Sequence, residues 1–206
     1  MILLHDAQVL QEDLEKACDW SDKWQLPFNE GKCKVMHFGM KNNKHLYAMR
    51  GFLLNEVDHE KDLGVTIDSK LVFNVHVADV AMRANRKLGM VYRAFKFLNM
   101  DGFLRLYKAI IRPTLEYCNV VFNSLHCKEE DLLEKVQERA TKLIFSIRHL
   151  PYSERLKILN LPTLAYRRQR AHLIQIFKIL HGVDSISADS FFSVMKMLEH
   201  VVILLN

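Results

Sequence analysis

The spacing of hydrophobic residues predicts that the chain begins with an amphipathic helix. Apolar and small side chains recur every three or four residues, while acidic side chains occupy the other faces. The stripe consists of Leu10, Leu14, Ala17, Ser21 and Trp24. We therefore expect a helix over residues 6–25 that Pro27 ends. The helical spacing also predicts that Trp20 and Trp24 lie in the core, with stacking on a nucleic-acid base as the alternative.

Between Cys33 and Asp68 the pattern changes to a period of two, which is typical of strands. Short apolar runs alternate with asparagine and glycine residues that favour turns. The runs cover residues 34–38, 46–49, 52–54 and 63–67. We expect them to form a small antiparallel sheet. Gly64 falls inside the last run, so we interpret it as a bulge or as a point where another backbone, such as that of a nucleic acid, approaches closely.

After Phe73 the pattern is helical, and strand signals are absent. The predicted helices cover residues 74–98, 101–122, 128–147, 152–159 and 163–182. The first of them carries one apolar stripe, formed by Val77, Ala81, Ala84, Leu88, Val91, Phe95 and Leu98. We interpret the apolar run at 201–205 as a helix end or a sticky tail. The predicted fold class is α+β, with a small antiparallel sheet and one flanking helix followed by an all-helical bundle.

Positive charge gathers on the first two of these predicted helices. The chain has 29 Lys and Arg against 24 Asp and Glu, and residues 83–112 carry eight bases and one acid. The bases that lie opposite the apolar stripe are Arg83, Arg86, Arg93 and Lys96. A helix with one buried face and one cationic face can lie along a nucleic-acid backbone and release counterions. A solvated surface is the alternative, and the same two interpretations apply to the cluster Arg167, Arg168 and Arg170.

The remaining motifs exclude several classes of protein. The sequence has no HExxH, no zinc-type spacing of Cys and His, no GxSxG and no glycine-rich phosphate loop. The four cysteines are widely spaced, and we expect them to be reduced thiols. We interpret the acidic triplet 129–131, which opens a predicted helix, as capping rather than as a metal site. Because no run suits a signal peptide or a membrane span, we expect an intracellular protein, nuclear or cytoplasmic, with no membrane contact. We also expect no small-molecule substrate.

Three blocks of sequence are informative when they are taken together. The first covers residues 20–39 and combines a helix end, a Pro-Asn-Gly turn and a strand, and the second covers residues 60–68. The third is Leu115-Glu116-Tyr117, which follows Tyr107-Lys108 and Arg112-Pro113. In order and spacing these blocks resemble the non-LTR (LINE-type) reverse transcriptases, most closely the jockey-like and chicken-repeat group. The resemblance runs from about Leu10 to about Phe192.

The resemblance implies three parts of a polymerase. Residues 1–70 would be the end of the palm, residues 71–192 the thumb and the helices after it, and residues 193–206 a divergent tail. The turn at Leu63 and Gly64 would help to hold the primer end.

Two lysines also match a feature of the family. Lys32 or Lys34 would correspond to a lysine near the leaving phosphate, where an ammonium group stabilises departing charge. A surface lysine that starts a strand is the alternative interpretation.

The family enzyme copies RNA into DNA with Mg²⁺ ions held by palm carboxylates. Its aspartate pair would precede residue 10, where this chain has Asp6 without an adjacent Asp. We therefore expect no catalytic residue, no metal site and no cofactor in this chain, and no polymerase activity on its own. The expected partners are RNA or an RNA/DNA hybrid and the missing palm and fingers.

The sequence thus predicts a carboxyl-side fragment of an RNA-directed DNA polymerase, truncated at both ends, that retains primer-template contacts. A non-catalytic nucleic-acid-binding module and a genomic remnant without a function are the alternatives.

Overall fold

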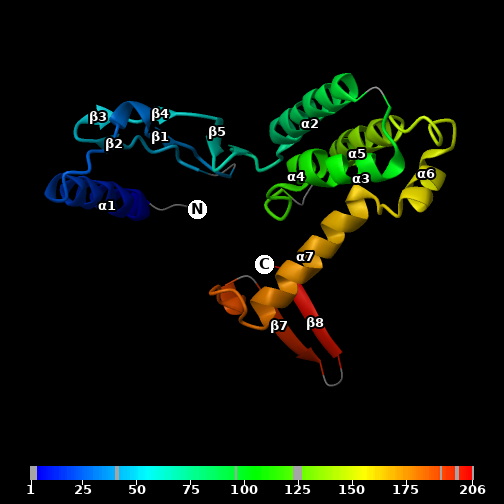
Figure 1. The fold of residues 1–206 in the computed structure, drawn as a ribbon. Coiled ribbons are helices and arrows are strands. Elements are labelled where there is room, and N and C mark those ends of the chain that lie inside the picture. The colour runs from blue at the N-terminus through cyan, green and yellow to red at the C-terminus, as the bar shows by residue number, and fades with distance from the viewer. Residues whose placement is uncertain are drawn as a thin grey trace. The chain divides into compact units, whose positions relative to one another are not determined.

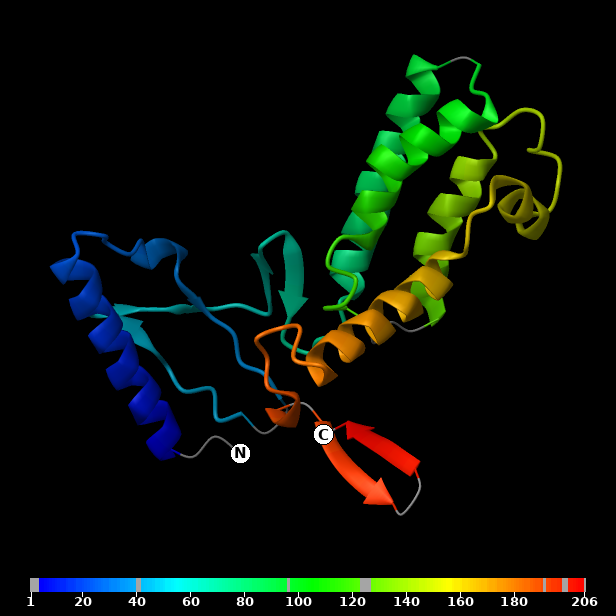
Figure 2. The same cartoon turned by 60° about the horizontal axis from the view of Figure 1, so that its bottom comes forward.

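The structure, a computed structural model, describes residues 4–39, 42–95, 97–122, 127–190, 192–197 and 200–205. They belong to two compact units, Met1–His76 and Val77–Asn206. The first unit combines a helix with short strands, and the second is mostly helical (Figure 1, Figure 2). The α+β class predicted from the sequence is confirmed.

The first unit begins with helix α1 (Leu4–Lys23), close to the predicted range. After the 3-10 turn η1 (Glu30–Lys32) come β1 (Lys34–Val35), β2 (Ala48–Met49), β3 (Phe52–Leu53), β4 (Asn55–Glu56), β5 (His59–Asp62) and β6 (Val65–Asp68). Within the described residues these strands pair two by two. The pairs β2–β3 and β5–β6 are antiparallel, and the pair β1–β4 is parallel.

These strands differ from the expected sheet in two respects. They form separate ladders, one of them parallel, because most strands are only two residues long and have little length with which to add a further neighbour. The strand β5 was not expected, because His59–Asp62 shows no apolar alternation. Its register with β6 runs from His59↔Asp68 to Asp62↔Val65. Pairing with β6, rather than its own pattern, makes this segment a strand.

The core of the first unit lies between α1 and the strands. The buried side chains are Ala7, Cys18, Tyr47, Met49 and Leu54, with Leu14, Cys33 and Val35 packed against them. Gln11 adds a polar anchor, since its amide donates to the Ala48 carbonyl at 2.9 Å and accepts from the Ala48 N–H at 3.0 Å. The side chain of Gln11 thus satisfies the strand backbone much as a neighbouring strand would.

The prediction that Trp20 and Trp24 lie in the core is wrong. They are 52% and 61% exposed, whereas Ser21 is fully buried. The Ser21 hydroxyl donates to the Leu26 carbonyl at 2.7 Å, which directs this face of α1 inwards, towards the turn after the helix. Periodicity gave the correct helix and included the covered Leu14 and Ser21, but Leu10 and Trp24 of the predicted stripe are exposed, and Ala7 and Cys18 are buried instead.

The second unit is built from helices. They are α2 (Asn74–Ala94, which starts in the first unit), α3 (Met100–Leu106), the π-helical segment η2 (Tyr107–Ile111), α4 (Arg112–Glu116), α5 (Cys127–Thr141), α6 (Tyr152–Leu159), α7 (Leu164–Leu180) and the 3-10 turn η3 (Ala188–Ser190). The order matches the sequence prediction. The second predicted helix ends at Glu116 rather than at residue 122, because a turn begins at Tyr117.

The apolar stripe of α2 is buried as predicted over most of its length. Val77, Ala81, Ala84, Leu88 and Val91 are at most 7% exposed. Phe95 is 46% exposed, since α2 ends at Ala94 and the stripe cannot continue beyond it. The continuous segment from α3 through η2 to α4 buries Phe103, Tyr107, Ile111 and Leu115.

A buried polar network joins the helices of the second unit. Gln137 of α5 accepts from the Tyr107 hydroxyl and donates to the Tyr152 hydroxyl at 2.9 Å and to the Pro162 carbonyl at 3.0 Å. Glu134 accepts from Tyr152 and from the backbone N–H of Leu164 at 2.9 Å. Burial raises the pKa of Tyr107, so its hydroxyl stays protonated and continues to donate. These bonds fix α6 and the start of α7 against α5.

The chain ends in a β-hairpin that the sequence did not predict. Strand β7 (Phe192–Met197) pairs antiparallel with β8 (His200–Leu205), with Val194 opposite Ile203. The interpretation of residues 201–205 as a helix end or tail is therefore corrected. The β-branched residues Val201, Val202 and Ile203 favour extended backbone, and the segment before them supplies the partner strand.

Candidate nucleic-acid interface

Three arginines project from α2 away from its buried stripe. Arg86 and Arg93 are exposed, and Arg83 is half-buried. Arg86 and Arg93 are seven residues apart, which separates them by about 10.5 Å along the helix axis. That distance corresponds to about three nucleotides of one duplex strand, at about 3.4 Å each. This spacing would match phosphates of one B-form strand if α2 lay along that strand.

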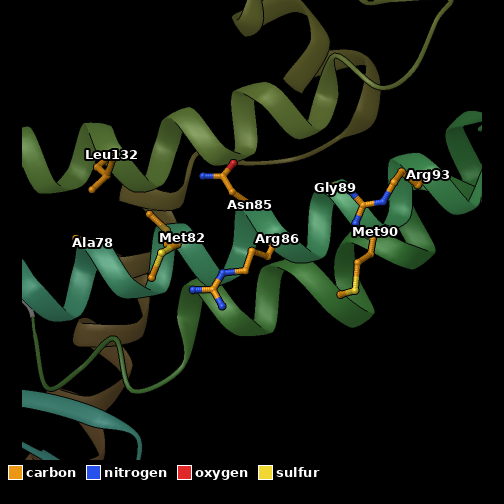
Figure 3. Close-up of a pocket in the computed structure, with 9 residues that line it drawn as sticks. Ala78, Met82, Asn85, Arg86, Gly89, Met90, Arg93 and Leu132 are labelled. Carbon is orange, nitrogen blue, oxygen red and sulfur yellow. The ribbon is translucent and has the colours of Figure 1, made fainter.

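An open groove of about 790 Å³ runs along this part of α2 (Figure 3). Figure 3 shows Arg86, Met90 and Arg93 projecting from one stretch of α2, with Leu132 contributed by α5. The lining residues are Ala78, Ala81, Met82, Asn85, Arg86, Gly89, Met90, Arg93 and Leu132. None of these lining residues is a carboxylate, so an approaching phosphate group meets cations, an amide and apolar surface.

The sequence analysis missed part of this lining. Met82 and Gly89 share a four-three-four spacing with Arg86 and Arg93, so the same helical analysis could have found them. Leu132 gave no signal, because it comes from another helix. The Asn85 carbonyl of the side chain accepts from Arg139 Nη1 of α5 at 2.9 Å, which ties the two walls together.

The other cations of α2 are partly engaged by neighbours. Arg83 forms an ion pair with Asp79 at 3.0 Å, one turn earlier on the same helix. Lys87 Nζ donates to the Thr114 hydroxyl at 2.7 Å. Lys96, the fourth predicted base of this face, lies outside the described residues. Arg86 and Arg93 are therefore the strongest candidates for contacts with phosphate.

The basic cluster of α7 divides between interior and surface. Arg168 is 4% exposed and donates to Glu130 of α5 at 2.9 Å. Arg167 makes a two-pronged contact with the Glu116 carboxylate, and this hydrogen bonding raises the pKa of Arg167. Only Arg170 of the three is exposed. Arg167 and Arg168 hold α7 against α4 and α5, so neither interpretation of the cluster, phosphate contact or solvated surface, describes the buried Arg168.

The Leu63–Gly64 pair forms the tip of the β5–β6 hairpin. Leu63 has φ 45° and Gly64 has φ 86°, so both turn residues adopt the left-handed conformation that type I′ turns require. Gly64 is therefore a turn residue, and its interpretation as a bulge inside a strand is wrong. The Leu63 side chain is 83% exposed, so the hairpin presents an apolar tip to solvent.

Lys32 and Lys34 lie at the start of the strands. Lys32 ends η1 and is exposed, and Lys34 begins β1. Lys34 Nζ contacts Glu60 Oε2 at 2.7 Å, and this hydrogen bond lowers the pKa of the Glu60 carboxyl. Both partners are well exposed, so this ion pair is open to exchange with a phosphate.

Asp68 organises the entry to α2 and was not singled out from the sequence. Its carboxylate accepts from the backbone N–H groups of Lys70 and Val72 at 3.1 Å and of Phe73 at 2.6 Å. Leu71 and Phe73 have φ angles of 54° and 59°, which non-glycine residues rarely adopt. The three hydrogen bonds hold this strained segment. The sequence feature that could have pointed to Asp68 is the run of polar residues at the end of β6.

The described residues contain no group of three His, Cys, Asp or Glu side chains that could hold a metal ion. Glu129 and Glu130 of the acidic triplet lie in the first turn of α5, where acids favour the positive helix end. In the part of the chain that the structure covers, no helix has both the length and the apolar character needed to cross a membrane.

Comparisons with known proteins find similarity to retrotransposon polymerases. The chain is 26% identical over 159 residues to the RNA-directed DNA polymerase from mobile element jockey of Drosophila funebris, which covers 75% of this chain and 17% of that protein. A probable RNA-directed DNA polymerase from transposon X-element of Drosophila melanogaster is 23% identical over 146 residues, covering 68% and 16% of the two chains. No family model and no solved structure matches.

A third relative is a shorter protein. An uncharacterized protein of Caenorhabditis elegans is 26% identical over 127 residues, which cover 60% of this chain and 62% of that protein. The chain spans less than a fifth of the length of the two polymerases, at 17% and 16%. This chain is thus related to one segment of the RNA-directed DNA polymerases of jockey-like, non-LTR retrotransposons.

Proposed function

We propose that this chain binds RNA or an RNA/DNA hybrid through the exposed arginines of α2, as the counterpart of the thumb of a reverse transcriptase. The observation that carries the proposal is the groove along α2, where Arg86 and Arg93 lie two turns apart and no lining residue is a carboxylate. Contacts of this kind depend on charge and not on base sequence, so we expect binding with little sequence preference and with strong salt dependence.

Three residues of the first unit are proposed as further contacts. Leu63 at the exposed hairpin tip would touch the primer end, with Gly64 allowing the tight turn. Lys34 would exchange its ion pair with Glu60 for a phosphate, and the exposed Lys32 would add charge beside it. These roles rest on the resemblance to the polymerase family.

The two-metal site of a polymerase does not fit the residues that the structure describes. Two magnesium ions need several converging carboxylates, and the described part of the chain contains no group of three possible ligands. The proposal therefore assigns binding, and no polymerisation step, to these residues. Magnesium belongs to the intact family enzyme.

The decisive test is a salt series of binding to a fluorescently labelled RNA/DNA hybrid. The affinity of the purified chain should fall steeply with salt concentration. The variant Arg86→Gln/Arg93→Gln should bind more weakly at low salt. Its slope of log K against log salt should be shallower by about two, since each lost phosphate contact removes about 0.9 of slope on a B-form duplex.

A matched variant separates this site from general charge effects. Lys128→Gln/Lys157→Gln removes two exposed cations from α5 and α6, outside the groove, with the same change in net charge. It should keep a slope close to that of the unchanged chain. Equal slopes for the two double variants would contradict the proposal, as would the absence of binding by a chain whose circular dichroism shows intact helices.

A further inference from the structure

A second hollow lies elsewhere in the helical unit, apart from the groove of Arg86. It has a volume of about 940 Å³, within the usual range of ligand pockets. The end of α2, the start of α3 and the turns after α5 form its walls. Its lining residues are Tyr92, Phe95, Phe97, Leu98, Asn99, Gly102, Arg105, Leu106, Lys142, Leu143, Phe145, Ser146 and Arg148.

Aromatic side chains are unusually exposed around this hollow. Tyr92 is 67% exposed, Phe97 96% and Phe145 74%. Burial of a large apolar ring normally stabilises the fold. Single exposed rings are common, but several in one hollow mark a binding surface. These side chains are therefore accessible to a ligand that enters the hollow.

The same hollow is lined by cations and by no carboxylate. The guanidinium of Arg148 lies 4.3 Å from the centre of the Phe145 ring, a cation–π contact that keeps the ring and the charge together. Lys142 forms an ion pair with Glu138 at 3.2 Å, and Arg105 forms one with Asp101 at 3.1 Å. Both pairs are on the surface, where such contacts are worth little and exchange readily with a stronger anion.

We propose that this hollow binds unpaired bases of a single-stranded nucleic acid. Rings that accept a flat partner, interleaved with cations that accept phosphates, form the surface that single-strand binders use. An apolar peptide would explain the rings but not the cations, and a duplex would explain the cations but not the rings, because its bases are already stacked. The inference rests on the proposed function and extends it: the α2 groove holds the paired backbone, and this hollow holds the unpaired strand.

The test compares two labelled 12-residue strands, one of ordinary RNA and one with the same backbone but no bases. The unchanged chain should bind the ordinary strand at least about tenfold more tightly. The variant Phe97→Ala/Phe145→Ala should lose that difference, because stacking on one base contributes about tenfold or more by alanine substitution. Both rings are highly exposed, so their removal should leave the fold intact.

Control variants distinguish this site from the α2 groove. Phe177→Ala removes a ring that is 56% exposed on α7, and it should keep the preference for bases. Arg86→Gln/Arg93→Gln should weaken binding of the hybrid while leaving the preference for bases in place. Equal affinity for the two strands would overturn the inference even where the hybrid binds. A preference for bases that survives Phe97→Ala/Phe145→Ala would also overturn it, and would place the stacking on other rings, such as Trp20 and Trp24.

Discussion

Asp68 shows how one carboxylate can determine the path of the chain. Burial raises the pKa of its carboxyl, but the backbone N–H groups of Val72, Phe73 and Lys70 lower it by more, so the pKa lies below its ordinary value. The ionised form is therefore the one that holds the segment after β6. The strained φ angles of Leu71 and Phe73 persist because this carboxylate holds the backbone around them.

Asp68→Asn should destabilise the first unit at pH 7 by about 1–3 kcal/mol, because the amide cannot accept at both positions and a buried N–H loses its partner. A lowered folded pKa means that the stabilisation is complete above the unfolded pKa of about 3.9 and disappears as the pH falls through the folded pKa. Urea unfolding of the unchanged chain and of Asp68→Asn at pH 7, 5 and 3 measures the difference between their free energies of unfolding. This difference should become smaller between pH 5 and pH 3. A free-energy difference that stays the same at all three pH values would contradict this account of Asp68.

At the residue scale, the sequence predicted which face of a helix is exposed better than it predicted which side chains contact one another. Arg86 and Arg93 are exposed as expected, because a helix with one apolar stripe must turn its cations away from the core. Arg168 is buried against Glu130, and periodicity cannot detect a carboxylate that arrives from a distant helix. The exposure of Trp24 has a different cause, because α1 ends at Lys23 and Trp24 lies beyond the helix whose periodicity predicted its burial.

At the scale of elements, helices were predictable and short strands were not. The predicted α6 range, 152–159, agrees with the structure, because the signals for a short helix are local: Pro151 precedes it and Asn160 ends it in the left-handed conformation. The strand β5 has no apolar alternation and depends on its partner β6. The apolar run of β8 is compatible with a helix or a strand, and pairing with β7 decides for the strand. The groove of Arg86 was predictable only on the α2 side, for the same reason.

Two glycines in neighbouring helices should respond in opposite ways to alanine. Gly89 of α2 has only the Arg93 guanidinium near an added Cβ, at 3.8 Å, so Gly89→Ala should stabilise the helical unit by about 0.5–1 kcal/mol. At Gly102 an added Cβ would lie 2.9 Å from Asn99 Oδ1, which caps α3 by accepting from the Gly102 N–H. Gly102→Ala should cost about 1 kcal/mol through that cap. Thermal unfolding followed by circular dichroism at 222 nm gives the Tm of each variant. Shifts of Tm in the same direction for Gly89→Ala and Gly102→Ala would contradict the prediction.

At the scale of the whole molecule, the two units differ in how much structure supports them. Strands of two to four residues in separate pairs make the first unit marginal, whereas the second has long helices joined by a buried polar network. The relation to retrotransposon polymerases was predicted from the order and spacing of three blocks of sequence. The chemistry of the individual residues would not have predicted it. The contacts with nucleic acid stay predictions, since they depend on a partner outside the chain.

Hydrogen exchange should reveal this difference directly. Amides of β2 and β3 should exchange much faster than those of α5 at neutral pH, because few buried side chains oppose opening of the first unit. Mass spectrometry of peptides from each unit gives the comparison in one experiment. Protection of the first unit equal to that of α5, or a sharp cooperative unfolding of residues 1–70 by themselves, would show that it is not marginal.

The π-helical segment of the second unit has a consequence for changes in chain length. The buried residues Phe103, Tyr107, Ile111 and Leu115 are each four apart, and on a regular α-helix that spacing drifts by about 40° per step. The wide turn over Tyr107–Ile111 absorbs the drift. Removing one exposed residue between Tyr107 and Ile111 would give a regular helix with four-three-four spacing and the same buried side. The segment should therefore tolerate the loss of one residue there without exposing its buried side chains.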